Sequence, residues 1–190
     1  MSRTDTRRAA IIEAIADHIL AHGLAAASLR PIARAAGLSD RMLLYYFPDK
    51  AAVLAAALEL LSARLTQKLA AVTTAPLPPS ALQARLASVL FTPELWPYLC
   101  LYLDMAAMAA RGDTAMQTVG ERLGRGFLAW GEAQLDSPPH DRAADAAHLL
   151  VTIEGMLMLR SLGLGDVADA AIAAAPSRIQ APGQRRPPTG

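Results

Sequence analysis

Residues 28–50 read SLRPIARAAGLSDRMLLYYFPDK, and this stretch decides the fold. Ser28 predicts the start of a short helix, because a serine oxygen caps the free N–H groups of a first turn. Gly37 permits the positive φ of a sharp turn. Ser39 then caps a second short helix, which Pro48 ends. Two short helices joined by such a turn form a helix-turn-helix pattern.

The segments on either side of this pattern are also predicted to be helical. Ile12, Ile15 and Ile19 recur at a spacing of three to four residues, which places them on one helix face. Gly23 ends that helix in the manner of a left-handed C-cap. On the other side, a long helix is expected over residues 50–72.

Composition sets the broad class of the protein. Hydrophobic residues make up 53% of the 190 residues and charged residues 18%, which excludes a disordered or collagen-like chain. Alanine and leucine dominate, so an all-α fold is predicted. No apolar run is long enough to cross a membrane. The single cysteine, Cys100, excludes an intrachain disulfide and a cysteine-built zinc site. A soluble, cytoplasmic protein is expected.

Nothing in the sequence indicates an enzyme, a cofactor or a metal centre. There is no Gly-x-Gly-x-x-Gly, phosphate-loop or Gly-x-Ser-x-Gly pattern, and Ser, His and Asp lack the spacing of a triad. His18 and His22 have the i, i+4 spacing of a metal-binding pair. No third ligand is evident, so a solvated pair is the favoured interpretation.

Charge is distributed unevenly along the chain. Residues 1–50 carry seven basic and five acidic side chains, whereas residues 51–176 carry eight basic and twelve acidic ones. A mildly basic head on an acidic body is typical of a DNA-binding module joined to a second unit.

The helix-turn-helix segment resembles the N-terminal domain of the TetR family of one-component transcriptional repressors, over about residues 7–62. Asp40, Arg41, Met42 and Leu44 depart from the family's usual residues, which indicates an unusual operator sequence. The resemblance implies a homodimer on a pseudo-palindromic DNA operator, with an inducer cavity in the body. It is carried by Ile32-Ala33, Ala36-Gly37-Leu38-Ser39, Leu43, Tyr46-Phe47-Pro48 and Lys50.

By this resemblance, the second helix of the motif enters the major groove. Arg41 is expected to read guanine, or else to contact phosphate. Tyr45 contacts a thymine methyl or a phosphate, or packs between helices. Asp40 contacts a cytosine amino group or offsets Arg41, and Tyr46 and Lys50 resemble phosphate-contacting residues of the family. The two serines cap helices, with or without a phosphate contact. The full predicted set is Ser28, Ser39, Asp40, Arg41, Met42, Tyr45, Tyr46 and Lys50.

The predicted organisation is a DNA-binding domain over residues 1–50, a helical ligand-binding and dimerisation domain over 51–175, and a disordered tail over 176–190. The helix over residues 143–162 is apolar nearly all round, so it must be buried on two sides. By resemblance to the family, this helix and the last helix pair with their twofold mates in a four-helix dimer bundle, although an ordinary core helix has the same pattern.

The ligand pocket is expected among soft and aromatic side chains of the body. Gly120, Gly124, Gly126 and Gly131 indicate close helix approach or room for a ligand. Asp104 and Glu154 are acids flanked mostly by apolar residues in the sequence, so each is expected either to anchor a ligand or to close a hydrogen-bond network. The other candidates have the spacing of ordinary core residues as well. The full set is Trp96, Tyr102, Asp104, Met105, Met108, Phe127, Trp130, Glu154 and Met158.

The sequence therefore predicts a homodimeric repressor that an apolar or amphipathic inducer releases from its operator. The alternative that the protein is an activator, in which the ligand acts on DNA binding in the opposite direction, also stays open. The alternative from another class is a helical lipid- or drug-binding module that acts through protein partners. Steep weakening of DNA binding by salt distinguishes the two.

Overall fold

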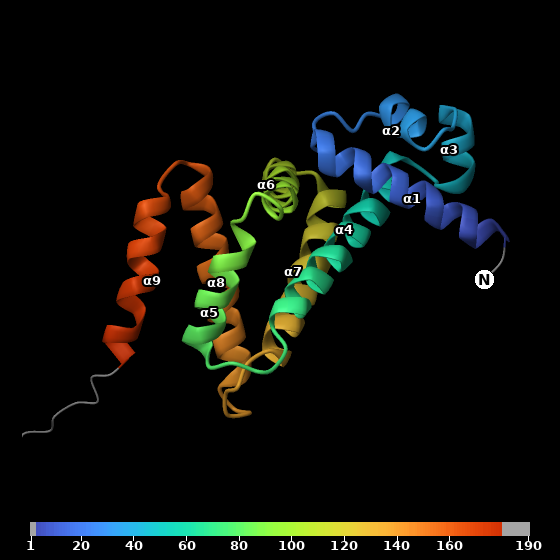
Figure 1. Ribbon diagram of the computed structural model, residues 1–190. Coiled ribbons are helices and arrows are strands. Elements are labelled where there is room, and N and C mark those ends of the chain that lie inside the picture. The colour runs from blue at the N-terminus through green and yellow to red at the C-terminus, as the bar shows by residue number, and fades with distance from the viewer. Residues whose placement is uncertain (1–2, 180–190) are drawn as a thin grey trace, which may run out of the picture.

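The computed structural model describes residues 3–179, and within that range the chain forms nine α-helices and no β-strand (Figure 1), which confirms the all-α prediction. The first four helices are α1 (Arg3–His22), α2 (Leu29–Ala35), α3 (Asp40–Tyr46) and α4 (Lys50–Val72). The body adds α5 (Pro79–Leu90), α6 (Trp96–Ala110), α7 (Thr114–Ala133), α8 (Arg142–Ser161) and α9 (Gly165–Ile179).

Local sequence signals set the boundaries of the first helices as predicted. Gly23 and Gly37 adopt φ values of +78° and +67°, which L side chains rarely reach. The Ser39 hydroxyl accepts a 3.2 Å hydrogen bond from the backbone N–H three residues on, and Asp49 accepts the equivalent bond at 2.8 Å. These caps fix where α3 and α4 begin.

The end of the body differs from the sequence prediction. Helix α9 runs to Ile179, so residues 176–179 continue a helix rather than begin a tail. The alanines at 170, 171 and 173–175 favour helix up to Pro176, whose missing N–H does not end the helix. Residues 180–190, the rest of the predicted tail, lie outside the described residues.

Two apolar clusters hold the chain together. The first packs α1, α2, α3 and the start of α4 around side chains such as Ile15 and Phe47, and extends to Met105 and Met116 of the body. The second packs the end of α4 against α5, α6, α7 and α8. Figure 1 shows α4 running from the head into the body beside α7. Helix α4 therefore belongs to both clusters and connects them.

Figure 1 also places α3 at one end of the molecule and α9 at the other. Ion pairs from Arg64 of α4 to Glu13 and Asp17 of α1 join the connecting helix to the head. Within the described residues, no helix is long and apolar enough to span a membrane.

Candidate functional site

The surface of α3 is the first candidate site. Leu43 is fully buried in the head, which turns the remaining side chains of this short helix outward. Tyr45 is 76% exposed, and Met42 and Leu44 are also exposed. Arg41 lies exposed beside them. An exposed group of large apolar side chains around a cation marks a binding surface.

The predicted DNA-contacting residues lie on one continuous segment, α2 to the start of α4. Arg41, Met42 and Tyr45 are exposed on α3, whereas Asp40 and Tyr46 of the same helix are half-buried. The remaining three, Ser28, Ser39 and Lys50, are exposed at the starts of α2, α3 and α4.

One detail of the predicted capping is wrong. The Ser28 hydroxyl makes no capping hydrogen bond to α2, whereas the Ser39 hydroxyl does. Ser28 therefore holds the N-cap position by its extended backbone alone.

Three further arginines lie on α1 and α2 of the head. Arg30 and Arg34 are exposed on α2 and were not in the predicted DNA-contacting set. Their positive charge on the first helix of the motif was the sequence feature that could have identified them. Arg8 of α1 lies over the Phe47 ring, 4.8 Å from its centroid, so a cation–π contact holds its guanidinium at the head.

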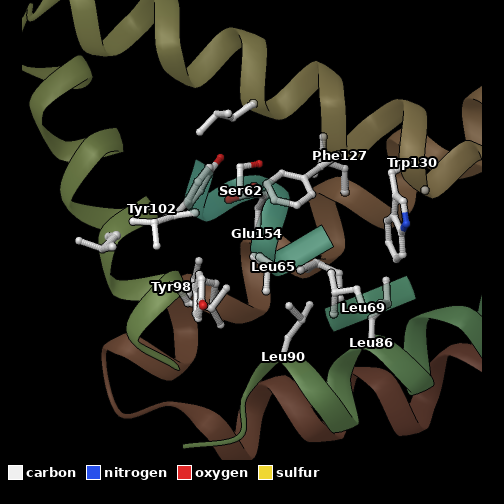
Figure 2. A pocket seen from close by; sticks show the side chains of 18 of the residues that line it. Ser62, Leu65, Leu69, Leu86, Leu90, Tyr98, Tyr102, Phe127, Trp130 and Glu154 are labelled. Atoms are coloured by element: carbon white, nitrogen blue, oxygen red, sulfur yellow. The ribbon is translucent and has the colours of Figure 1, made fainter. Parts of the chain in front are cut away.

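The second candidate site is a pocket of about 120 Å³ between α4, α5, α6, α7 and α8 (Figure 2). Leucines from all five helices make up more than half of its lining residues. Ser62, Tyr98, Tyr102 and Glu154 are the side chains on that wall that carry oxygen. The pocket is therefore an apolar space with a small polar part, as small-molecule sites usually are.

The structure brings five of the nine predicted ligand residues to this pocket. They are Tyr102, Met105, Phe127, Trp130 and Glu154. The sequence prediction missed the leucines of the wall, because leucine at helical spacing is indistinguishable from ordinary core. The missed leucines include Leu58, Leu61, Leu65, Leu69, Leu86, Leu90, Leu149 and Leu157.

The other four predicted ligand residues lie away from the pocket wall. The Trp96 ring sits 6.5 Å from that of Phe91, and Met108 packs against the first apolar cluster. Met158 is 52% exposed, because it lies on the outer face of α8. Asp104 points to the head instead.

Asp104 links the body to the head. Its Oδ2 accepts a 3.2 Å hydrogen bond from the backbone N–H of Leu24, directly after α1. Gly23 also touches this carboxylate, since a Cβ added there would lie 3.4 Å from Oδ2. Because Asp104 belongs to α6, which also lines the pocket, this bond connects the two candidate sites.

Burial governs the electrostatics of the pocket. It raises the pKa of Glu154, and a hydrogen bond from Tyr102 opposes part of that shift. Burial and the same hydrogen bond raise the pKa of Tyr102 well above its usual range, so the phenol stays protonated and acts as the donor. Glu154 thus has one neutral hydrogen-bond donor beside it.

The histidine pair shows no metal-binding geometry. The rings of His18 and His22 stack with centroids 4.4 Å apart, and His22 Nδ1 lies 2.8 Å from the His18 carbonyl oxygen. Burial and the neighbouring His22 lower the pKa of His18. Across residues 3–179, no cluster of three or more His, Cys, Asp or Glu residues could hold a metal.

Helices α8 and α9 present an apolar outer face. Val151 and Leu162 are 69% and 68% exposed, and Met158 and Val167 are exposed beside them. Along α8 and its C-cap residue Leu162, positions 151, 155, 158 and 162 alternate steps of four and three residues, with Gly155 between the large side chains. This spacing forms a single seam along the helix of the kind that pairs with another helix.

Comparisons with known proteins agree with this architecture. Residues 11–64 match the family model described as bacterial regulatory proteins, tetR family. No curated protein matches the chain. The family model covers α1 from its third turn, the helix-turn-helix and most of α4, so it covers the candidate DNA surface.

Solved structures extend the likeness to the whole fold. A TetR-family transcriptional regulator from Cytophaga hutchinsonii superposes with a TM-score of 0.72 at 20% identity, over 92% of this chain and 93% of that one. A putative TetR-family regulator from Rhodococcus sp. gives 0.69 at 20% identity, over 90% and 96%. A putative transcriptional regulator from Pseudomonas aeruginosa PAO1 gives 0.68 at 20% identity, over 96% and 94%. At such identities the likeness establishes the fold.

Proposed function

We propose, from the premise that the chain belongs to the TetR family of DNA-binding transcriptional regulators, that it is a homodimeric repressor released from its operator by a small molecule. The observation that carries the proposal is the exposed α3 surface, with Arg41 and Tyr45 outward on a helix that Leu43 anchors. This surface lies within the segment that matches the family model.

The head supports specific roles for its side chains. Arg41 reads guanine, since a guanidinium bonds O6 and N7 of that base together. Lys50 stands at the N-terminus of α4, where its charge and the free N–H groups of the helix face phosphate. Ser39, Tyr46 and Ser28 add backbone contacts on either side, Asp40 offsets Arg41, and Met42 and Tyr45 make apolar contacts in the groove.

The outer face of α8 and α9 supports a homodimer. One helix-turn-helix head buries too little surface for tight operator binding, so two heads must act together on a pseudo-palindrome. The apolar seam through Val151, Met158 and Leu162 would be covered by the same seam of a second copy, as closed twofold symmetry requires. Residues 1–50 then act as the DNA-binding unit and residues 51–175 as the dimerisation and ligand-binding unit.

Helix α4 supports coupling between ligand and DNA. It lines the pocket through residues such as Leu61 and Leu65, and it begins at Lys50 in the head. A ligand that favours a shifted α4 changes the separation of the two heads. About 1.4 kcal/mol of differential affinity changes operator affinity tenfold.

The alternative, a binding module that acts through protein partners, is less well supported, because the family model matches the segment that would contact DNA. An activator would use the same geometry, but its ligand would strengthen operator binding and not weaken it. Operator binding would take place in the cytoplasm, where the DNA lies.

Fluorescence anisotropy with full-length protein tests the proposal. Duplexes tiled across the promoter of the protein's own gene should include one that binds far more tightly than scrambled DNA. Binding should weaken steeply with salt, because each phosphate contact releases counterions. A monomer in solution that binds none of these duplexes contradicts the proposal.

A further inference from the structure

We infer that the pocket takes a lipophilic monocation, a protonated amine or quaternary ammonium on a short apolar body, held by Glu154. This inference rests on the proposed function, because it names the ligand class of the same pocket. Three features of the pocket support it: the charge of its wall, the grouping of its polar side chains and the partners of the Glu154 carboxylate.

The pocket wall carries an acid and no base. Among its lining residues, all of which lie in the described part of the chain, Glu154 is the one carboxylate, and there is no Lys, Arg or His. An anionic ligand such as a fatty acid would bury a second negative charge beside the first without a compensating cation. Burial of unpaired like charges is strongly unfavourable, so the wall selects against anions.

Three of the five wall side chains that carry oxygen or nitrogen lie together, whereas Tyr98 and Trp130 lie elsewhere on the wall. Figure 2 shows Tyr102 and Ser62 near Glu154, with Leu86 and Leu90 on the far side of the space. The three polar residues come from α6, α4 and α8 respectively. A ligand with one polar end and one apolar end fits this division.

The Glu154 carboxylate has less compensation than a buried charge requires. Tyr102 donates one hydrogen bond to it, and burial nevertheless raises its pKa. No salt bridge involves Glu154 in the described residues. A ligand ammonium would provide the missing positive charge, and the aromatic rings of Tyr102 and Phe127 on the same wall would attract it through their faces.

The neutral alternative is a ligand that only fills the apolar space. Such a ligand would gain from the leucines alone and would leave the carboxylate as it is. A matched ligand series separates these alternatives, because the apolar body is held constant while the head group changes.

The test uses isothermal titration calorimetry of the full chain with octylamine, octyltrimethylammonium, 1-octanol and octanoate. We expect both cations to bind at least about tenfold more tightly than octanol, and octanoate to bind most weakly. Equal binding of octanol, tighter binding of octanoate, or no binding by any of the four would overturn the inference.

Two variants assign the preference to Glu154. Glu154→Gln should remove the preference for cations and leave octanol binding within about twofold. Glu132→Gln is the matched control, because Glu132 is also half-buried but does not line the pocket, and it should keep the preference. Tyr102→Phe should keep it as well, since the carboxylate remains. A cation preference that survives Glu154→Gln overturns the assignment.

Folding of Glu154→Gln is checked by circular dichroism, and the wild-type ligand series decides the ligand class even if that variant does not fold. Operator binding is measured separately, without ligand. If the protein binds no operator but still prefers cations, the proposed function is wrong and this inference on the ligand class stands. Operator binding together with a preference for neutral or anionic ligands would defeat this inference alone.

Discussion

The α3 surface and the α8–α9 surface lie at opposite ends of the molecule and both expose large apolar side chains, but they differ in charge. On α3, Tyr45 and Met42 stand beside Arg41, with Lys50 close by in sequence. On α8, the exposed seam through Val151, Met158 and Leu162 contains no charged residue at its repeating positions. The α3 surface is suited to binding a polyanion that also has apolar groups in its groove. The α8–α9 surface is suited to binding the same surface of a second copy of the chain. Exposure alone therefore does not identify a partner, whereas exposure together with charge does.

The largest expected effect comes from a charge placed in the uncharged seam. Val151→Glu should convert the dimer to monomer, because a twofold interface would bury two unpaired carboxylates. Operator affinity should then fall about 100-fold or more, since each head must bind alone. Analytical ultracentrifugation and fluorescence anisotropy measure the two effects.

The matched control for Val151→Glu is Ala70→Glu, on an exposed position of α4. It adds the same charge outside the seam and should leave both the mass and the operator affinity unchanged. If Val151→Glu stays dimeric with native affinity, the seam is not the interface and the contrast between the two surfaces fails.

The charged surface allows a second, smaller test. Arg41→Ala should cost about 1–3 kcal/mol per base contact and relax preference at one operator position. Lys50→Ala should weaken binding to all sequences alike and reduce the salt slope by about one, because it removes a single phosphate-binding charge. Binding titrations on a set of single-base operator variants at several salt concentrations distinguish the two patterns.

Arg111→Ala is the control for this pair, because Arg111 is exposed in the turn after α6. A uniform loss for Arg41→Ala would reassign that side chain from bases to phosphate. Unchanged binding by both head variants would remove α3 as the DNA-contacting helix.

The same contrast explains how much could be predicted from sequence. The helix boundaries of the head were predictable, because its turns and caps are local: Gly37 and Ser39 act on residues three or four positions away. The pocket was predicted only in part, because five helices assemble it. Its leucines have the spacing of any core helix, and only packing shows which of them face a space. Asp104 lies away from the pocket wall, and its hydrogen bond to Leu24, 80 residues away, supports the other predicted role, an acid that closes a hydrogen-bond network.

The buried pocket carboxylate of Glu154 predicts that stability depends on pH. Burial raises the pKa of Glu154 on folding, so the native state binds the proton more tightly than the unfolded state. The free energy of unfolding should therefore fall as the pH rises from the ordinary carboxyl range through the raised pKa. Tyr102, on the same wall, stays neutral across this pH range because burial raises its pKa.

Urea denaturation across this pH range should show the decline in wild type and a shallower one in Glu154→Gln. Glu132→Gln should behave as wild type. An identical pH dependence in wild type and Glu154→Gln would show that the carboxyl keeps its ordinary pKa in the folded protein.

The smallest expected effect concerns the one hydrogen bond that joins the pocket helix α6 to the end of α1. Asp104→Asn keeps the size of the side chain but weakens the charge-assisted bond to the Leu24 N–H by about 1 kcal/mol. Amide hydrogen exchange at Leu24 should become about fivefold faster, whereas operator affinity without ligand should change little. Asp136→Asn, an exposed position, is the control and should leave that exchange unchanged. Asp104 does not line the pocket, so the affinity for octyltrimethylammonium should not change in Asp104→Asn. A change in that affinity would mean that Asp104 contacts the ligand and not Leu24 of the head. Unchanged Leu24 exchange with native coupling between ligand and operator would leave α4 as the route between the two sites.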